Sequence, residues 1–278
     1  MSAIYFLSGL PRSGNTLLSS ILNQNPSVYC SPISPLLDNL LALKSQGKSE
    51  NNLVVDFSAN SEQATKTYVN GFYQNCDKPV IFDRNKDWGS KESMVFAYQF
   101  IPNQPKIVFT VRDIPSILTS FISLLGDEPV SYLDNQILQY RMRPYGKQTQ
   151  NDLRCDLLMN TQVGGCLATL DEAIRMQVSL HLVEYDDLVS DPQKTLNSVY
   201  DFLEIDRWEH DFNNVKKLEV ETLSVAGLPP NLHDVRPQVK KESLGPKDVL
   251  SELTLRKYSD LEFWRNQIVL DVVHNQLV

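Results

Sequence analysis

The chain has 278 residues, of which 42% are hydrophobic and 22% are charged, so it is long enough for one large α/β domain or two small ones. Its formal net charge of −8 argues against non-specific nucleic-acid binding as a main role. No apolar run reaches the length of a membrane span, and the apolar residues 3–8 lack the basic flank of a signal peptide. We therefore expect neither nucleic acid nor a membrane as a partner.

The first predicted elements are a strand, a glycine-containing loop and a helix. Residues 3–8 form an apolar run that Gly9 closes, which is typical of a buried parallel strand, and leucines at helical spacing follow the loop. The loop has the spacing of a nucleotide-binding P-loop, because Gly9 and Gly14 flank four residues and Thr16 stands where that motif has Ser or Thr. Asn15, however, occupies the position of the lysine that reaches the β- and γ-phosphates. The loop is thus suited to a phosphate but lacks a residue that a nucleoside triphosphate requires.

Strands and helices are expected to alternate along the rest of the chain. Buried-type strands are predicted at 79–83, 106–111 and 179–185, and helices at 35–44, 61–75, 90–100, 114–125, 131–142, 156–176 and 190–205, with a last helical pattern from Asp260. This alternation predicts an α/β fold with a P-loop-type, doubly wound parallel sheet flanked by helices. We expect a single domain over 1–278, with a core of about 1–205 and a C-terminal segment of about 206–278 that covers cofactor and substrate.

Backbone groups of the loop are predicted to hold the phosphate. Five consecutive N–H groups would point into the loop or lie in the first turn of the helix, where anions bind. These belong to Ser13, Gly14, Asn15, Thr16 and Leu17. Arg12 adds the fixed fork of a guanidinium. Two other interpretations stay open, a plain turn and a kinase-like NTPase in which Thr16 and Asp83 hold Mg²⁺.

A second anion site is predicted after the strand at 106–111. Arg112 stands at the C-terminal end of that strand, and Ser120 follows a little over two helical turns later. Ligands of open α/β sheets gather at the C-terminal ends of the strands. Two anion sites at one sheet edge therefore indicate a ligand with two separated phosphate groups. Taken alone, Arg112 would be better explained by a surface salt bridge with Asp113.

Three segments together resemble a known family. The segment "GLPRSGNTLL" resembles the 5′-phosphosulfate loop of sulfotransferases that use 3′-phosphoadenosine 5′-phosphosulfate (PAPS), and "VRDIPSILTSF" resembles their 3′-phosphate strand and helix. The segment "LVEYDDLVSDPQKTLNSVYDFLEI" resembles the one whose Tyr lies against the adenine. The three lie in the family's order and span most of residues 4–205. Cys30 and the run Asn85-Lys86-Asp87 fit the branch that includes tyrosylprotein sulfotransferases and many bacterial relatives.

The resemblance implies an enzyme that moves a sulfuryl group from PAPS to a hydroxyl acceptor, without a metal. It implies that the loop and Arg12 bind the 5′ group, that Arg112 and Ser120 bind the 3′-phosphate, and that Tyr185 lies beside the adenine. Arg236 is a further expected cofactor ligand, because it belongs to a basic stretch that resembles a segment of bacterial members.

Catalysis of sulfuryl transfer requires cations where charge develops and a base for the acceptor proton. We assign Arg12 to the leaving-group side and Lys86, just past the strand at 79–83, to the transferring sulfuryl group. Candidates for the base are Asp83 and Asp87, which flank Lys86, and His233.

The acceptor is expected to be a small molecule or a glycan rather than a protein tyrosine. In the tyrosylprotein branch a Glu follows shortly after the Cys that matches Cys30. Here Ile33 and Ser34 follow, and the next carboxylate is Asp38. A catalytically inactive nucleotide-binding module therefore stays open beside the enzyme and the NTPase. Four cysteines without metal-ligand spacing predict reduced thiols in a cytoplasmic protein.

Overall fold

The computed structural model describes residues 2–47, 58–125, 131–217, 231–241 and 243–265. A five-stranded parallel sheet in the order β2-β3-β1-β4-β5 forms its centre. The strands are β1 (Ala3–Gly9), β2 (Val28–Cys30), β3 (Val80–Arg84), β4 (Ile107–Val111) and β5 (Leu180–Glu184). Four of them lie within two residues of their predicted positions, which confirms the predicted parallel sheet. The three-residue β2 was not predicted, because so short a strand carries no recognisable pattern.

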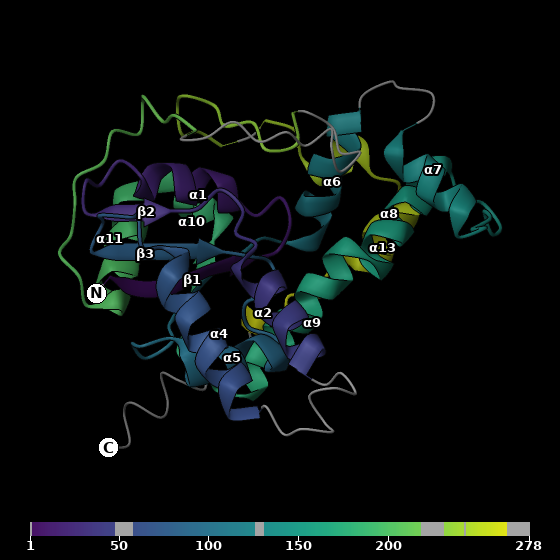
Figure 1. The fold of residues 1–278 in the computed structure, drawn as a ribbon. Coiled ribbons are helices and arrows are strands. Elements are labelled where there is room, and N and C mark those ends of the chain that lie inside the picture. Colours follow the sequence, from purple (N-terminus) through teal and green to yellow (C-terminus); the bar gives the residue numbers. More distant parts are fainter. Residues whose placement is uncertain (1, 48–57, 126–130, 218–230, 242, 266–278) are drawn as a thin grey trace, which may run out of the picture.

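Helices cover both faces of the sheet, as Figure 1 shows. Phe6, Phe82 and Phe109 on the three central strands are fully buried, as expected of strands covered on both sides. The side chains of Leu7 and Val108 belong to the hydrophobic cluster under α1 (Asn15–Leu22), α10 (Tyr185–Ser190) and α11 (Pro192–Leu203). The alternate strand residues belong to a larger cluster on the opposite face. The predicted doubly wound fold is thus confirmed.

The remaining helices lie on or beside that second face. They are α2 (Leu36–Gly47), α4 (Ser58–Phe72), α5 (Lys91–Phe100), α6 (Ile114–Leu125), α7 (Tyr132–Gln139), α8 (Gln150–Asn160), α9 (Gln162–Arg175), α12 (Pro246–Val249) and α13 (Glu252–Tyr258). Within the described part of the chain, no helix is long and apolar enough to span a bilayer. Helices α6 to α9 and α13 extend away from the sheet in Figure 1.

The single helix predicted at 156–176 is wrong, because the structure has two helices that meet at Thr161. Thr161 has φ −127° and ψ −96°, which no helix accommodates. Two glycines follow, and a Cβ atom on Gly164 would lie 2.1 Å from the carbonyl oxygen of Met159. Only glycine therefore permits this close joint between α8 and α9.

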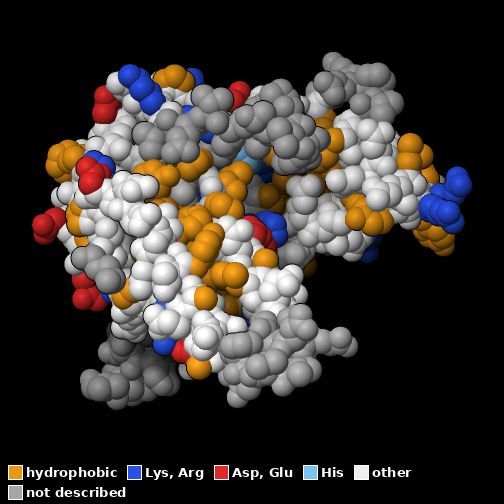
Figure 2. Space-filling view, viewed as in Figure 1, with side chains coloured by type: hydrophobic (Ala, Val, Ile, Leu, Met, Phe, Trp, Pro, Cys, Tyr) orange, Lys and Arg blue, Asp and Glu red, His pale blue; other side chains and the backbone are white. Residues whose placement is uncertain are grey.

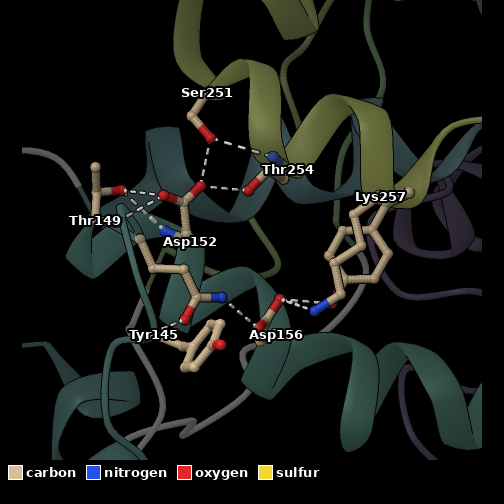
Figure 3. A network of polar contacts seen from close by, with 9 residues as sticks. Tyr145, Thr149, Asp152, Asp156, Ser251, Thr254 and Lys257 are labelled. Carbon is tan, nitrogen blue, oxygen red and sulfur yellow. Dashed lines mark hydrogen bonds and ion pairs between the residues drawn. The ribbon is translucent and has the colours of Figure 1, made fainter.

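Polar contacts fasten the C-terminal helix α13 to α8 (Figure 3). The buried carboxylate of Asp152 accepts hydrogen bonds from Ser251 Oγ and Thr254 Oγ1, each at 2.5 Å. One turn further along α8, Asp156 accepts from Lys257 Nζ at 2.9 Å and from Tyr258 Oη at 2.6 Å. These contacts tie the segment after Pro246 to the body of the molecule. The helical pattern predicted from Asp260 lies largely outside the described residues.

Candidate functional site

The loop between β1 and α1 has the backbone of a phosphate-binding turn. Gly14 precedes the helix with φ 92°, and Arg12 has φ 60°, so two residues of the loop adopt left-handed conformations. The backbone amides of Asn15, Thr16 and Leu17 open the first turn of α1, where amides have no partner within the helix. An anion at this helix end would meet free donors and the positive end of the helix dipole.

Ser13 contributes to the loop through its position and not through its hydroxyl. The side chain is fully buried, and Ser13 Oγ lies 2.5 Å from Thr110 Oγ1 and donates to the carbonyl oxygen of Leu10 at 2.5 Å. The hydroxyl thus fastens the loop to β4. The predicted role of Ser13 as a ligand rests on its backbone amide alone.

Arg12 and the predicted second anion site lie together. Arg12 Nε donates to Ser120 Oγ on α6 at 3.1 Å, and Arg112 Nη1 donates to the carbonyl oxygen of Arg12 at 3.1 Å. The Arg112 guanidinium lies over the ring of Tyr185, 4.0 Å from the ring centre. Three segments that are far apart in the sequence thus bring two guanidiniums, a hydroxyl and an aromatic ring to one sheet edge.

The described C-terminal segment closes over this cluster. Arg12 Nη1 donates a short hydrogen bond to the carbonyl oxygen of Leu232. The next residue, His233, is half-buried, and Arg236 is exposed. Both line the same pocket as Arg12 and Tyr185. The structure therefore brings His233 and Arg236 to the same end of the pocket as Arg12, whereas residues 218–230 lie outside the described chain.

One pocket of about 580 Å³ is lined by Arg12, Arg112, Ser120, Tyr185, His233 and Arg236. This volume lies within the range of small-ligand sites. In Figure 2, basic and acidic side chains meet in a hollow between the part that carries the sheet and the part that carries α6 to α9. Besides the loop, the pocket is lined by Ile33, Asp38, Arg84, Asn85, Lys86, Asp87, Phe121, Gln162 and Cys166. Its two ends are thus a cationic end at the loop and a mixed end after β3.

Lys86 lies in the pocket and is paired with its neighbour. Lys86 Nζ donates to both carboxylate oxygens of Asp87, at 2.7 and 2.8 Å, and its side chain is 69% exposed. An exposed pair of this kind contributes little to stability, so Lys86 is free to exchange Asp87 for an anionic ligand. Asp87, in turn, has both of its carboxylate oxygens bound to this cation.

Asp83 does not lie in the pocket, which corrects its assignment as a candidate base. Its carboxylate is fully buried on the opposite face of β3 and accepts hydrogen bonds from Ser34 Oγ, from Tyr73 Oη at 2.6 Å and from Trp88 Nε1 at 2.6 Å. Burial raises the pKa of Asp83, although these hydrogen bonds act in the opposite direction. The carboxylate fastens Trp88 and Tyr73 behind the site and cannot reach an acceptor.

Arg84 is a site residue that the sequence analysis missed. The residue is 9% exposed and lines the pocket, and its guanidinium donates to Thr16 Oγ1 at 2.9 Å and to Ser19 Oγ at 3.4 Å. The alternation of side chains along a strand could have identified it, because successive residues point to opposite faces of the sheet. Arg84 follows Asp83 and therefore lies on the opposite face of β3. A fixed guanidinium therefore stands beside the loop where a P-loop NTPase has Mg²⁺.

This arrangement disfavours the kinase-like interpretation. That interpretation requires Thr16 and Asp83 to share a magnesium ion, yet Thr16 is bound by Arg84 and Asp83 lies on the other side of the strand. The positive charge of Arg84 would also repel a divalent cation at Thr16. Within the described chain, no cluster of three or more His, Cys, Asp or Glu side chains could hold a metal ion.

The basic stretch at 140–147 lies away from the pocket. The exposed residues Tyr140, Arg141, Arg143, Tyr145 and Lys147 belong to this stretch, and none of them lines the pocket. Basic side chains occupy the tip beyond α7 in Figure 2. The stretch is thus a solvated region beyond the end of α7.

A parallel sheet with a phosphate-binding loop at the end of β1 and cations at the same edge defines an anion-binding α/β protein of the P-loop type. The profile of the sulfotransferase family matches residues 5–210, so this chain belongs to that family. The predicted family is thereby confirmed, and the loop, Arg112, Ser120 and Tyr185 all lie within the matched range.

Individual relatives are distant. Protein-tyrosine sulfotransferase 1 of Danio rerio is 22% identical over 212 residues, which cover 73% of this chain and 53% of that protein. Protein-tyrosine sulfotransferase A of Caenorhabditis elegans is 22% identical over 264 residues, which cover 91% of this chain and 64% of that protein. This chain thus spans about half to two thirds of the length of these relatives.

A solved structure agrees with the fold. The sulfotransferase domain from the curacin biosynthetic pathway superposes with a TM-score of 0.52 at 17% identity, over 92% of this chain and 95% of that one. At 17% identity this similarity shows a shared fold and does not identify a ligand.

Proposed function

We propose that this protein is an enzyme that transfers the sulfuryl group of PAPS to a hydroxyl acceptor. The observation that carries the proposal is the convergence of two anion sites on one pocket, with Arg12 hydrogen-bonded to Ser120 and its carbonyl oxygen held by Arg112. A ligand with a 5′-phosphosulfate and a 3′-phosphate on one adenosine matches two such sites joined by an aromatic wall.

The residues present fit this co-substrate. A Cβ atom on Gly14 would lie 3.0 Å from the ring of Tyr185, so this glycine leaves room between the loop and the ring. We propose that the loop amides, Arg12 and Arg84 bind the 5′ group, and that Arg112 and Ser120 bind the 3′-phosphate.

The adenine is proposed to lie against Tyr185, with Arg236 as an outer contact. The ring of Tyr185 stands at the end of β5, where α10 begins, and Arg112 lies over the ring. An aromatic ring beside a guanidinium offers a flat surface on which a purine can stack. Its position at the C-terminal ends of the strands is the usual ligand edge of this fold class.

The chemistry that these residues support is stabilisation of charge on the leaving phosphate and the transferring sulfuryl group. Arg84 is fixed by two hydroxyl groups, so its charge needs no reorganisation during the reaction. Lys86 is held more loosely and can turn from Asp87 toward the sulfuryl oxygens as charge moves onto them. We propose that no metal takes part, because Arg84 supplies the cation at Thr16.

The acceptor is proposed to be a small molecule or a glycan. The mixed end of the pocket presents Ile33, Asn85 and Gln162, and it lacks the Glu that follows the matching Cys in tyrosylprotein sulfotransferases. The relatives named above act on protein tyrosine, so an acidic tyrosine peptide belongs in any acceptor screen as the competing class. A cytoplasmic location, supported by four free cysteines, stays a proposal.

Nucleotide-dependent stabilisation tests the proposal. Thermal unfolding is measured with 3′-phosphoadenosine 5′-phosphate (PAP), AMP, and ATP with and without Mg²⁺. A ligand at 100 times its Kd stabilises a protein by about 2.7 kcal/mol. PAP without metal is expected to give the largest shift, and a preference for ATP with Mg²⁺ would overturn the proposal. Radiolabelled PAPS then separates an enzyme from an inactive binding module, which would bind PAP without turnover.

A further inference from the structure

Asp38 is a carboxylate of the pocket that none of the roles above uses. It lies in the first turn of α2, is exposed, and lines the pocket at the end opposite Tyr185. Its Oδ2 atom accepts a hydrogen bond from Asn85 Nδ2 at 3.3 Å. Because Asn85 immediately precedes Lys86, this contact holds the carboxylate close in the chain to the cation that is proposed to stabilise the transferring sulfuryl group.

The backbone that carries Asp38 is held firmly. Leu36, Leu37 and Leu40 of the same helix are at most 1% exposed, and Ser34 Oγ accepts from the Leu36 amide at 3.1 Å at the start of the helix. The side chain of Asp38 has a single weak hydrogen bond and open space in front of it. The helix is thus fixed while the carboxylate is free to meet a substrate.

The other carboxylates near the site are less suited to accept a proton. Asp87 is bound to Lys86 through both oxygens, and Asp83 is buried behind the strand. Asp234 lines the pocket from the C-terminal segment, two residues after the carbonyl oxygen that binds Arg12, and therefore at the donor end. Among the described carboxylates, Asp38 lies at the mixed end of the pocket, where the acceptor is proposed to bind. Its one weak hydrogen bond leaves its oxygens available to the acceptor hydroxyl.

We propose that Asp38 is the general base of the reaction, an inference that rests on the proposed function. The acceptor oxygen forms a bond to sulfur while the bond between sulfur and the bridging oxygen of PAPS breaks, and that electron pair stays on the 5′-phosphate. The hydroxyl proton moves to the carboxylate of Asp38. The products are a sulfate ester, PAP and protonated Asp38, which returns its proton to water.

The position also explains how this chain dispenses with the Glu expected near Cys30. That Glu would follow β2, where this chain has Ile33 and Ser34 instead. The carboxylate is supplied a few residues later, from the first turn of α2.

Three variants test the assignment. Asp38→Asn keeps the size of the side chain and its contact with Asn85 but removes the proton acceptor, and Asp38→Ala leaves a space. Asp77→Asn is the matched control, because the Asp77 side chain is 89% exposed and does not line the pocket. Binding of PAP is measured by calorimetry, and transfer is measured from radiolabelled PAPS to water and to 4-nitrophenol, which ionises without help near neutral pH.

General bases contribute about a hundredfold or more to such rates. We expect Asp38→Asn to bind PAP like the parent but to hydrolyse PAPS about a hundredfold more slowly, with a much smaller loss toward 4-nitrophenol. Added formate is expected to restore part of the hydrolysis rate in Asp38→Ala and to leave the parent unchanged. A purely structural role would not respond to formate or to acceptor acidity.

Two results separate the possible failures. Hydrolysis by Asp38→Asn at the parental rate, or equal losses toward water and 4-nitrophenol, overturns Asp38 as the base and leaves the proposed function standing. A parent protein that neither binds PAP nor turns over PAPS overturns the proposed function and this inference with it.

Discussion

Replacement of Arg112 by alanine tests the most specific part of the site, which is its discrimination between two nucleotides. PAP and AMP differ by the 3′-phosphate, and Arg112 with Ser120 is proposed to bind that group. Arg112 is 8% exposed, so its contact with a phosphate would be largely shielded from water. A hydrogen bond to a charged group in such a site contributes about 1.5–3 kcal/mol, which corresponds to a change of about 10- to 150-fold in Kd.

The structure gives this experiment an internal control. Arg112 also holds the carbonyl oxygen of Arg12, whose left-handed backbone belongs to the 5′ loop. Damage to that loop would weaken PAP and AMP by the same factor, whereas loss of the 3′ contact weakens PAP alone. The ratio of the two Kd values therefore isolates the 3′-phosphate.

Calorimetric titration of the parent, Arg112→Ala and Arg175→Ala with both nucleotides provides the measurement. Arg175 is a suitable control because its side chain is 76% exposed on α9 and it does not line the pocket. The parent is expected to prefer PAP, Arg112→Ala to lose most of that preference, and Arg175→Ala to keep it. Equal affinity of the parent for the two nucleotides would refute the reasoning, as would a fall in both affinities by one factor in Arg112→Ala.

Four further predictions follow from individual side chains. Tyr185→Ala should weaken PAP binding about tenfold because the adenine loses its stacking surface, and an unchanged Kd in the folded variant would remove Tyr185 from the site. Lys86→Ala should lower kcat about a hundredfold while the Kd of PAP changes little, and a loss of affinity in proportion to rate would contradict a transition-state role. Arg84→Ala should weaken the binding of PAP and of AMP by the same factor, because Arg84 is proposed to contact the 5′ group that both nucleotides share. Arg84→Lys should recover part of this loss. Weaker binding of PAP alone would instead indicate that Arg84 contacts the 3′-phosphate. Burial alone would raise the pKa of Asp152, but hydrogen bonds from its neighbours on α13 and at the start of α8 hold it at about 2. Its contribution to stability is therefore complete above the pKa of the unfolded chain and lost as the pH falls from about 4 toward 2, so acid unfolding of Asp152→Asn should show a weaker pH dependence than that of the parent.

The sequence by itself determined the sheet and the donor end of the site. Apolar runs of strand length alternate with helical patterns along the chain, and this alternation predicts a parallel α/β sheet. It is visible in the sequence because the period of buried positions differs between strands and helices. The loop motif was readable for the same reason, since Gly9, Gly14 and Thr16 are neighbours in the chain and act through the local backbone. Arg112 with Ser120 was readable because a strand and the helix that follows it form one local unit.

Only the tertiary structure decided which charged residues share the pocket. Asp83 and Arg84 are adjacent in the sequence, yet the pleat of β3 buries one behind the sheet and brings the other to the loop. Asp38 enters the acceptor end because α2 packs its leucines against the core and thereby turns its opposite face to Asn85. The break at Thr161 likewise escaped the sequence pattern, because the close approach of Gly164 to Met159 is set by packing between helices and not by the local preference for helix.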